Sequence, residues 1–298
     1  MLHALKPIFR SIVVTGLMAL PLGAPGRSGA AGADAMNGAV RTEHSEASLL
    51  ADHAAVRPGQ RFLVALRLRH DAGWHSYWIN PGDSGLATRM KWSLPAGWHA
   101  DDIQWPVPER FEVDGLANYG YAGAVWLPMA IRVPDDAPVG TQVELAGDAR
   151  WLACADICVA EKARVAVRME VASQEQPDPA AEALARRMAA LPRLAVVDRG
   201  SVNVREDRLT FRFQALPDAL TPGAHYQVFP RQQQWLEHAP IDVRIDDDRS
   251  ATFTARRSSF YTRWPDTPSL LLRGEHPDQP AIELRLAFAP PTDDGEAP

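Results

Sequence analysis

Cysteine is nearly absent from this chain of 298 residues, which contains only Cys154 and Cys158. Two cysteines cannot build the set of several disulfides that holds many small secreted domains together. A bridge between these two would close a very short loop, and chain-entropy estimates give such a loop about 2 kcal/mol of stabilisation. A loop of about 100 residues would gain about 5 kcal/mol. We therefore expect the pair to serve chemistry more than stability.

Long hydrophobic runs are also missing. The apolar stretch Ile12 to Leu22 follows Lys6 and Arg10, and it is shorter than the roughly 20 residues that a membrane span needs. Small residues follow, and Ala31-Gly32-Ala33 fits the pattern of a cleavage site. These features predict a cleavable signal peptide over residues 1–33, with an uncleaved anchor helix as the alternative. We expect an exported, periplasmic protein in a compartment where disulfides form.

Positive charge is in deficit, because 31 Lys and Arg residues face 37 Asp and Glu residues and the formal net charge is −6. This balance argues against nucleic acid or an anionic membrane surface as a partner. The sequence also lacks paired-carboxylate, Ser-His-Asp, phosphate-loop and His-x-x-x-His signals. Without a spacing motif, His70, His75 and His99 are expected to be ordinary surface or core residues. We predict no cofactor and no bound metal.

Alternation of apolar side chains with a period of two residues dominates two blocks of the chain and predicts β-strands. The alternating segments are 62–68, 125–133, 143–151 and 163–171 in the first block, and 209–213, 241–245, 251–255 and 282–288 in the second. Turn signals such as Asn80-Pro81-Gly82 separate them. The pattern is typical of antiparallel sandwiches. We predict an all-β protein of two β-sandwich domains.

A change of composition near residue 173 separates the two blocks. Residues 174–179 are polar and Pro-containing, and the Ala-rich segment Ala180–Leu191 predicts a helix, with Asp178 as its cap and Pro179 at its first position. We place the domains as follows: 34–172 for the first sandwich, 173–196 for a linker with a helix, 197–290 for the second sandwich and 291–298 for a disordered tail.

The cysteine pair lies between the predicted strands 143–151 and 163–171. A tight connection through residues 155–157 would set Cys154 opposite Cys158 on a β-hairpin, where Cβ atoms are about 4.5–5.5 Å apart. A disulfide needs about 3.5–4.5 Å, so the bond can form with some strain, and strained disulfides are the more easily reduced ones. Three interpretations remain open: a reversible redox couple, which we favour, a structural clip, and a copper or zinc site. Asp156 and Glu161 would raise a thiol pKa here.

Four motifs in the same order resemble those of one family. They are Trp74–Leu86, which contains Asn-Pro-Gly-Asp-Ser-Gly, Gln104-Trp105-Pro106-Val107-Pro108, Asn118-Tyr119-Gly120-Tyr121, and Trp151–Cys158. From about Glu46 to Val171 the chain resembles the amino-terminal periplasmic domain of the DsbD-type thiol:disulfide interchange proteins, particularly the ScsB-like branch. The second block resembles, more weakly, the further β-domain of that branch.

The resemblance implies an immunoglobulin-like fold whose cysteine pair accepts electrons from a membrane-embedded partner and passes them to periplasmic thioredoxin-fold proteins. Cys154 and Cys158 would be the exchanging couple, with Cys158 attacking the partner disulfide. An aromatic cap over the pair would be Trp105 or Phe111. Tyr119 and Tyr121 would line the site or simply pack; the resemblance leaves both open.

DsbD-type proteins continue into a transmembrane electron conduit, and many end in a thioredoxin domain, whereas this sequence contains neither. We therefore expect a separately encoded membrane-embedded electron donor, and we expect the protein to be a monomer. The alternative function is a non-catalytic periplasmic module that binds a partner or takes part in copper tolerance.

Overall fold

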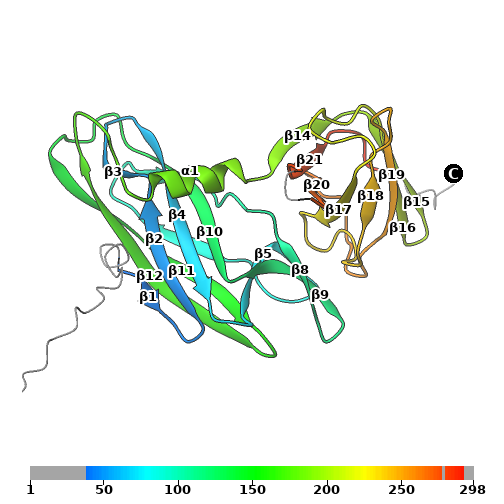
Figure 1. Ribbon diagram of the computed structural model, residues 1–298, viewed down its shortest axis with the longest axis horizontal. Coiled ribbons are helices and arrows are strands. Elements are labelled where there is room, and N and C mark those ends of the chain that lie inside the picture. Colours follow the sequence, from blue (N-terminus) through cyan, green and yellow to red (C-terminus); the bar gives the residue numbers. More distant parts are fainter. Residues whose placement is uncertain (1–37, 277–278, 292–298) are drawn as a thin grey trace, which may run out of the picture. The chain divides into compact units, whose positions relative to one another are not determined.

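The computed structural model describes residues 38–276 and 279–291 (Figure 1). The predicted signal peptide and nearly all of the predicted tail lie outside these residues. Within them the chain forms strands β1 to β21 and a single helix, α1, which confirms the all-β fold class. No helix among the described residues is long and apolar enough to cross a membrane.

Two sheets form the first sandwich, and their inward side chains share one hydrophobic core. The smaller sheet has the spatial order β1 (Val40–Arg41), β2 (Ser45–Ala51), β4 (Arg61–His70), β10 (Ala124–Arg132) and β7 (His99–Ala100). The larger sheet has the order β13 (Gln176–Pro177), β3 (His53–Val56), β12 (Cys158–Val171), β11 (Thr141–Cys154), β5 (His75–Gly82), β9 (Leu116–Ala122) and β8 (Glu109–Val113), with β6 (Arg89–Ser93) also paired to β11.

The second sandwich has sheets of five and three strands around its own core. The larger sheet has the order β14 (Arg193–Val197), β21 (Ile282–Leu286), β20 (Ser269–Gly274), β17 (His225–Pro230) and β18 (Asp242–Arg244). The smaller sheet has the order β15 (Gly200–Arg205), β16 (Arg208–Phe213) and β19 (Ala251–Arg256). The fold is therefore the predicted pair of β-sandwiches.

The alternation seen in the sequence is what builds the first core. In β4, Phe62, Val64, Leu66 and Leu68 are at most 2% exposed, and each such side chain contributes about 1.5–3 kcal/mol when it leaves water. A slip of one residue in the pairing would turn this whole row toward solvent. The apolar pattern therefore fixes the register of β4 against its neighbours β2 and β10.

The linker differs in detail from the prediction. Helix α1 (Ala181–Ala189) begins after the N-cap Ala180, which makes no side-chain cap. The prediction that Asp178 caps the helix was therefore wrong: its side chain accepts a hydrogen bond from the backbone N–H of Ala180 at 2.8 Å, ahead of the first helical turn. The segment also contributes β13 to the first sandwich and the start of β14 to the second.

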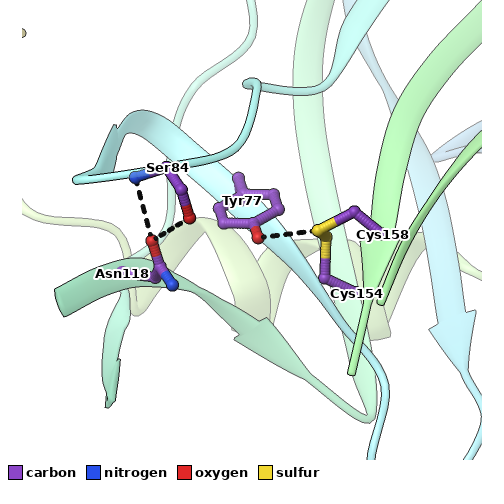
Figure 2. Close-up of a disulfide and its surroundings, with 5 residues drawn as sticks. All are labelled: Tyr77, Ser84, Asn118, Cys154 and Cys158. Carbon is purple, nitrogen blue, oxygen red and sulfur yellow. Dashed lines mark hydrogen bonds between the residues drawn. A yellow bond between two sulfur atoms is a disulfide. The ribbon is translucent and has the colours of Figure 1, made fainter. Parts of the chain in front are cut away.

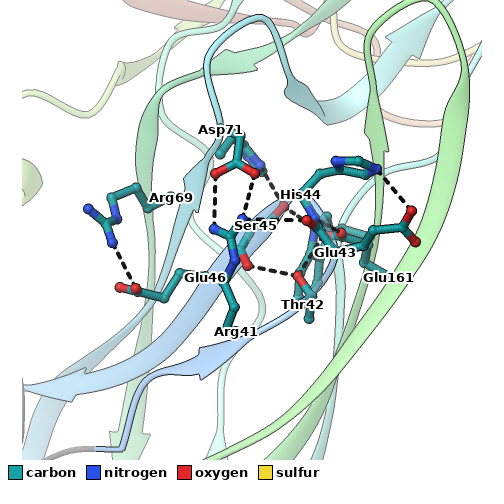
Figure 3. A network of polar contacts seen from close by, with 11 residues as sticks. Arg41, Thr42, Glu43, His44, Ser45, Glu46, Arg69, Asp71 and Glu161 are labelled. Carbon is teal, nitrogen blue, oxygen red and sulfur yellow. Dashed lines mark hydrogen bonds and ion pairs between the residues drawn. The ribbon is translucent and has the colours of Figure 1, made fainter.

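A polar network joins the first strands to β12 (Figure 3). Glu161 is 6% exposed, and it accepts hydrogen bonds from the hydroxyl of Thr42 at 2.9 Å and the backbone N–H of His44 at 2.6 Å. Burial opposes ionisation of Glu161, but hydrogen bonds from Ser45, His44 and other donors outweigh it and lower its pKa. The ionised carboxylate thus holds the β1–β2 connection against the strand that begins at Cys158.

Candidate redox site

Cys154 ends β11 and Cys158 begins β12, and the two form a disulfide with an S–S distance of 2.02 Å. They are the last pair in an unbroken antiparallel register that starts with Thr141 opposite Val171. The turn between them is closed by a hydrogen bond from the N–H of Ala155 to the carbonyl of Ile157 at 2.9 Å. The predicted hairpin with Cys154 opposite Cys158 is confirmed.

The two cysteines differ in their access to solvent. Cys154 is 1% exposed, whereas Cys158 is exposed, and Ile157 beside it in the turn is 65% exposed. Cys158 is therefore the member of the pair that an incoming thiol or disulfide meets from solvent. Thiol–disulfide exchange depends on which sulfur is open to attack, so this asymmetry gives the pair an outer and an inner member.

Tyr77 lies directly beside the outer sulfur (Figure 2). Its hydroxyl oxygen is 3.6 Å from Sγ of Cys158, and because a disulfide sulfur carries no hydrogen, the phenol is the donor. Burial raises the pKa of Tyr77, so the phenol keeps its proton at neutral pH. Tyr77 was not among the predicted site residues, although it lies inside the Trp74–Leu86 motif and alternates in step with His75.

His75 lies on the other side of the inner cysteine, directly opposite Cys154 in the pairing of β5 with β11. Its ring stacks on Phe111 with centroids 4.6 Å apart and an interplanar angle of 16°. It also meets the ring of Tyr77 edge-on at 5.3 Å. His75, expected as an ordinary surface or core histidine, is thus part of the surroundings of the disulfide, and it links Phe111 to them.

The other predicted aromatic residues pack into the sandwich. Trp105 is 9% exposed and belongs to the core of the first domain. Tyr121 donates a hydrogen bond to the carbonyl of Pro106 at 2.8 Å, and Tyr119 meets Phe229 edge-on at 5.1 Å. Burial raises the pKa of both tyrosines. Of the two cap candidates, Phe111 is the one that the structure connects to the disulfide, through His75.

The Asn-Pro-Gly-Asp-Ser-Gly segment supports Tyr77. At Gly85 the backbone has φ +98°, and a Cβ atom there would lie 2.3 Å from the Tyr77 ring, so only glycine fits without displacing the ring. The neighbouring Ser84 donates hydrogen bonds from its N–H and its hydroxyl to the side-chain oxygen of Asn118, at 3.2 and 2.9 Å (Figure 2). Two motifs that are distant in sequence therefore hold the residue that contacts Cys158.

The same segment also contacts the second sandwich. The side-chain amide of Asn80 donates to the carbonyls of Pro230 at 2.8 Å and Gln232 at 3.3 Å. The carboxylate of Asp83 lies 2.8 Å from Nδ1 of His238, and hydrogen bonds from His238 and the backbone of Ala117 lower the pKa of Asp83 although burial opposes this. The loop beneath Tyr77 is therefore fixed from both domains.

The acids near the cysteines are arranged differently from the prediction. Glu161 lies on the core face of β12, where it is held by Thr42 and His44, so its carboxylate is turned away from the face that carries Cys158. Asp156 is exposed in the turn. No group of three or more His, Cys, Asp or Glu residues within 38–276 and 279–291 is placed to hold a metal ion.

Fold and site together define an immunoglobulin-like β-sandwich that carries an accessible disulfide at the end of a hairpin. Residues 46–169 match the family described as "Thiol:disulfide interchange protein DsbD, N-terminal". This segment is a member of that family, and it is a thiol:disulfide interchange module with its cysteine pair in place.

One solved structure agrees with this assignment at the level of fold. The crystal structure of the N-terminal periplasmic domain of ScsB from Proteus mirabilis superposes with a TM-score of 0.60 at 16% identity, covering 84% of this chain and 96% of that chain. Sporulation control protein Spo0M from Bacillus subtilis and the major pilin SpaD from Corynebacterium diphtheriae, each 9% identical, cover 82% of this chain and 90% and 66% of their own. Their TM-scores of 0.24 and 0.25 are too low to bear on fold or function. A comparison with curated proteins gives no match.

Proposed function

We propose that this protein is an exported, periplasmic thiol:disulfide oxidoreductase that passes electrons through Cys154 and Cys158 to thioredoxin-fold proteins. The observation that carries the proposal is the disulfide itself, which joins one exposed and one buried cysteine at the end of a hairpin. Exposed disulfides are the labile or catalytic ones, whereas structural disulfides resist reduction. The match to a family of thiol:disulfide interchange proteins supports the same chemistry.

The proposed reaction has two exchanges. In the reduced protein the thiolate of Cys158 attacks a disulfide of the partner, a bond forms between Cys158 and one partner sulfur, and the other partner sulfur leaves as a thiolate. The thiolate of Cys154 then attacks Sγ of Cys158. This step restores the Cys154–Cys158 disulfide and releases, as a thiolate, the partner sulfur that was bonded to Cys158. Two electrons pass to the partner, whose disulfide becomes two thiols once the thiolates are protonated.

The pair would be reduced again by the reverse exchange with a donor, for which we propose a separately encoded membrane-embedded protein. Phe111 is the proposed cap. It lies on β8, which is an edge strand of its sheet and, within the part of the chain that the structure describes, pairs with β9 alone. An edge strand can move when a partner docks at the cost of one ladder of hydrogen bonds, whereas a central strand would lose two.

Trapping of a mixed disulfide tests the proposal. Cys154→Ser leaves the exposed sulfur of Cys158 free and removes the group that would release the partner. Mixed with a thioredoxin variant that keeps only its exposed active-site cysteine, activated as a mixed disulfide with nitrothiobenzoate, this variant is expected to release nitrothiobenzoate and to form a covalent complex that dithiothreitol dissolves. Cys158→Ser is the matched control, because its single thiol is buried and should trap little. Failure of both variants to trap, or equal trapping by both, would contradict the proposed roles.

A further inference from the structure

A nitrogen of His75 stands out among the groups around the disulfide. The residue is 4% exposed, and its Nε2 is buried without a hydrogen-bond partner among the described residues. A buried nitrogen of this kind costs about 1–3 kcal/mol of desolvation, and most buried polar side-chain atoms in folded proteins are hydrogen-bonded. The orphaned nitrogen therefore calls for an explanation in chemistry.

Its position suggests what that chemistry is. His75 is directly opposite Cys154, so both side chains leave the same face of the sheet with Cβ atoms about 4.5–5.5 Å apart. Cys154 is itself the buried member of the pair. A thiol in such surroundings loses its proton with difficulty, and no solvent reaches it to take the proton away.

The groups that face the ring are few. Tyr77 lies two residues along the same strand, the cysteine pair faces it from β11 and β12, and β8 presents the apolar ring of Phe111. The charged neighbours on β8, Arg110 and Glu112, bond to each other at 3.2 Å on its other face. Among the described residues, His70 is the other titratable group that senses the charge of His75.

We propose that His75 accepts the proton of the Cys154 thiol when Cys154 resolves the mixed disulfide, an inference that rests on the proposed function. The S–H bond of Cys154 breaks and its proton moves to Nε2, while the sulfur keeps the electron pair and bonds to Sγ of Cys158. The bond between Cys158 and the partner breaks, and the partner sulfur leaves as a thiolate. The imidazolium then gives its proton to that thiolate or to water, so the histidine ends unchanged.

The protonation state of the ring supports this role. Burial lowers the pKa of His75, so the imidazole is neutral at neutral pH and its free nitrogen can take a proton. The edge contact with Tyr77, which lies two residues along the same strand, holds the ring in place while it does so, including when Phe111 has moved aside for a partner. The role is distinct from that of Tyr77, which touches the outer sulfur and donates a hydrogen.

Two-phase kinetics with one equivalent of 5,5′-dithiobis(2-nitrobenzoate) separate the steps. Attack by Cys158 on the reagent releases the first nitrothiobenzoate, and closure by Cys154 releases the second. His75→Phe keeps an aromatic ring against Phe111, and His75→Gln keeps a polar group. In both variants we expect the second release to slow by about tenfold or more at pH 7. The pH profile of its rate should lose the step that titration of the imidazole causes. The rate of the first release should be unchanged.

The control is His53→Phe, because His53 also contacts a phenylalanine ring, that of Phe62, which it meets edge-on with centroids 6.4 Å apart. It lies on β3, which pairs with β12 at Glu170 and Val171, roughly 40 Å along the strand from Cys158. An unchanged first phase and near-UV circular dichroism establish that a slow variant is folded. A second phase with wild-type rate and pH profile in both His75 variants would overturn the inference alone. A wild-type protein that never releases the second equivalent would overturn the proposed function as well.

Discussion

At the scale of single residues, access to solvent assigns the parts in the proposed exchange. Cys158 is open to a partner, whereas Cys154 is 1% exposed and reaches only the sulfur beside it. Tyr77 donates to the outer sulfur, and His75 faces the inner cysteine. Each cysteine thus has its own polar neighbour, and the two neighbours lie two residues apart on one strand.

His70 provides a residue-scale prediction about pH. It is buried between the hydroxyls of Ser45 and Ser76, at 3.0 and 2.9 Å, and burial lowers its pKa from 6.5 to about 4. The unfolded chain binds a proton near pH 6.5 and the folded protein only near pH 4. The contribution of His70 to the free energy of unfolding is therefore complete above pH 6.5 and is lost as the pH falls toward 4. The loss is roughly 3 kcal/mol, at 1.36 kcal/mol per pKa unit.

Urea unfolding of the oxidised protein at several pH values between 7 and 4 checks this. His70→Gln keeps a polar group between the two serines but cannot titrate, so its free energy of unfolding should fall less steeply over the same range. Equal slopes for the variant and the wild-type protein would show that His70 is not the group responsible.

Sequence predicted the cysteines but not their two neighbours, for a physical reason. The pairing of Cys154 with Cys158 follows from local spacing between two alternating segments. The contacts of Tyr77 and His75 depend on which strand lies beside β11, and His75 of β5 comes 79 residues before its partner Cys154 in the chain. Alternation does place both side chains on one face of β5, but it does not say that the face meets the disulfide.

At the scale of elements, the hairpin β11–β12 presents the disulfide and the Asn80–Gly85 segment positions the residue next to it. The hairpin has a continuous register over its full length, so its tip is a stable platform. The segment ends at Gly85, whose backbone lies against the ring of Tyr77. Packing of this segment should therefore control access to the outer sulfur.

Gly85→Ala tests that control. A Cβ atom at this position would lie 2.3 Å from the Tyr77 ring and clash with it. The alanine backbone must also adopt φ +98°. We expect a loss of roughly 1–3 kcal/mol in the free energy of unfolding, together with faster reduction of the disulfide by dithiothreitol, because displacement of the ring leaves the exposed Cys158 more open to attack. Urea titration and the rate of thiol appearance measure the two effects.

Gly115→Ala is the matched control, since Gly115 has φ +78° but open space where a Cβ atom would lie. It carries the backbone strain without the clash, so its disulfide should be reduced at the wild-type rate. Identical reduction rates for the two variants would mean that Gly85 does not act through Tyr77.

At the scale of the whole molecule, two sandwiches are joined by more than a linker. Asn80 and Asp83 of the first contact Pro230 and His238 of the second, and β14 enters the second sheet as soon as the helix has ended. The sequence predicted the two sandwiches because apolar alternation is a local signal. It did not predict that Arg193 already belongs to a sheet. A short edge strand such as β14 can be identified only from the strand it pairs with, here β21, and that pairing is not visible in the local sequence.

The most direct test of the central claim is the reduction potential of the Cys154–Cys158 pair in the intact protein. Equilibration in glutathione buffers of defined ratio, followed by counting of free thiols, gives the value. The proposed exchange predicts a potential in the range of other carriers, roughly −180 to −270 mV. A potential below about −300 mV would mark a structural clip, contradict electron transfer through the pair and leave a partner-binding module as the better account.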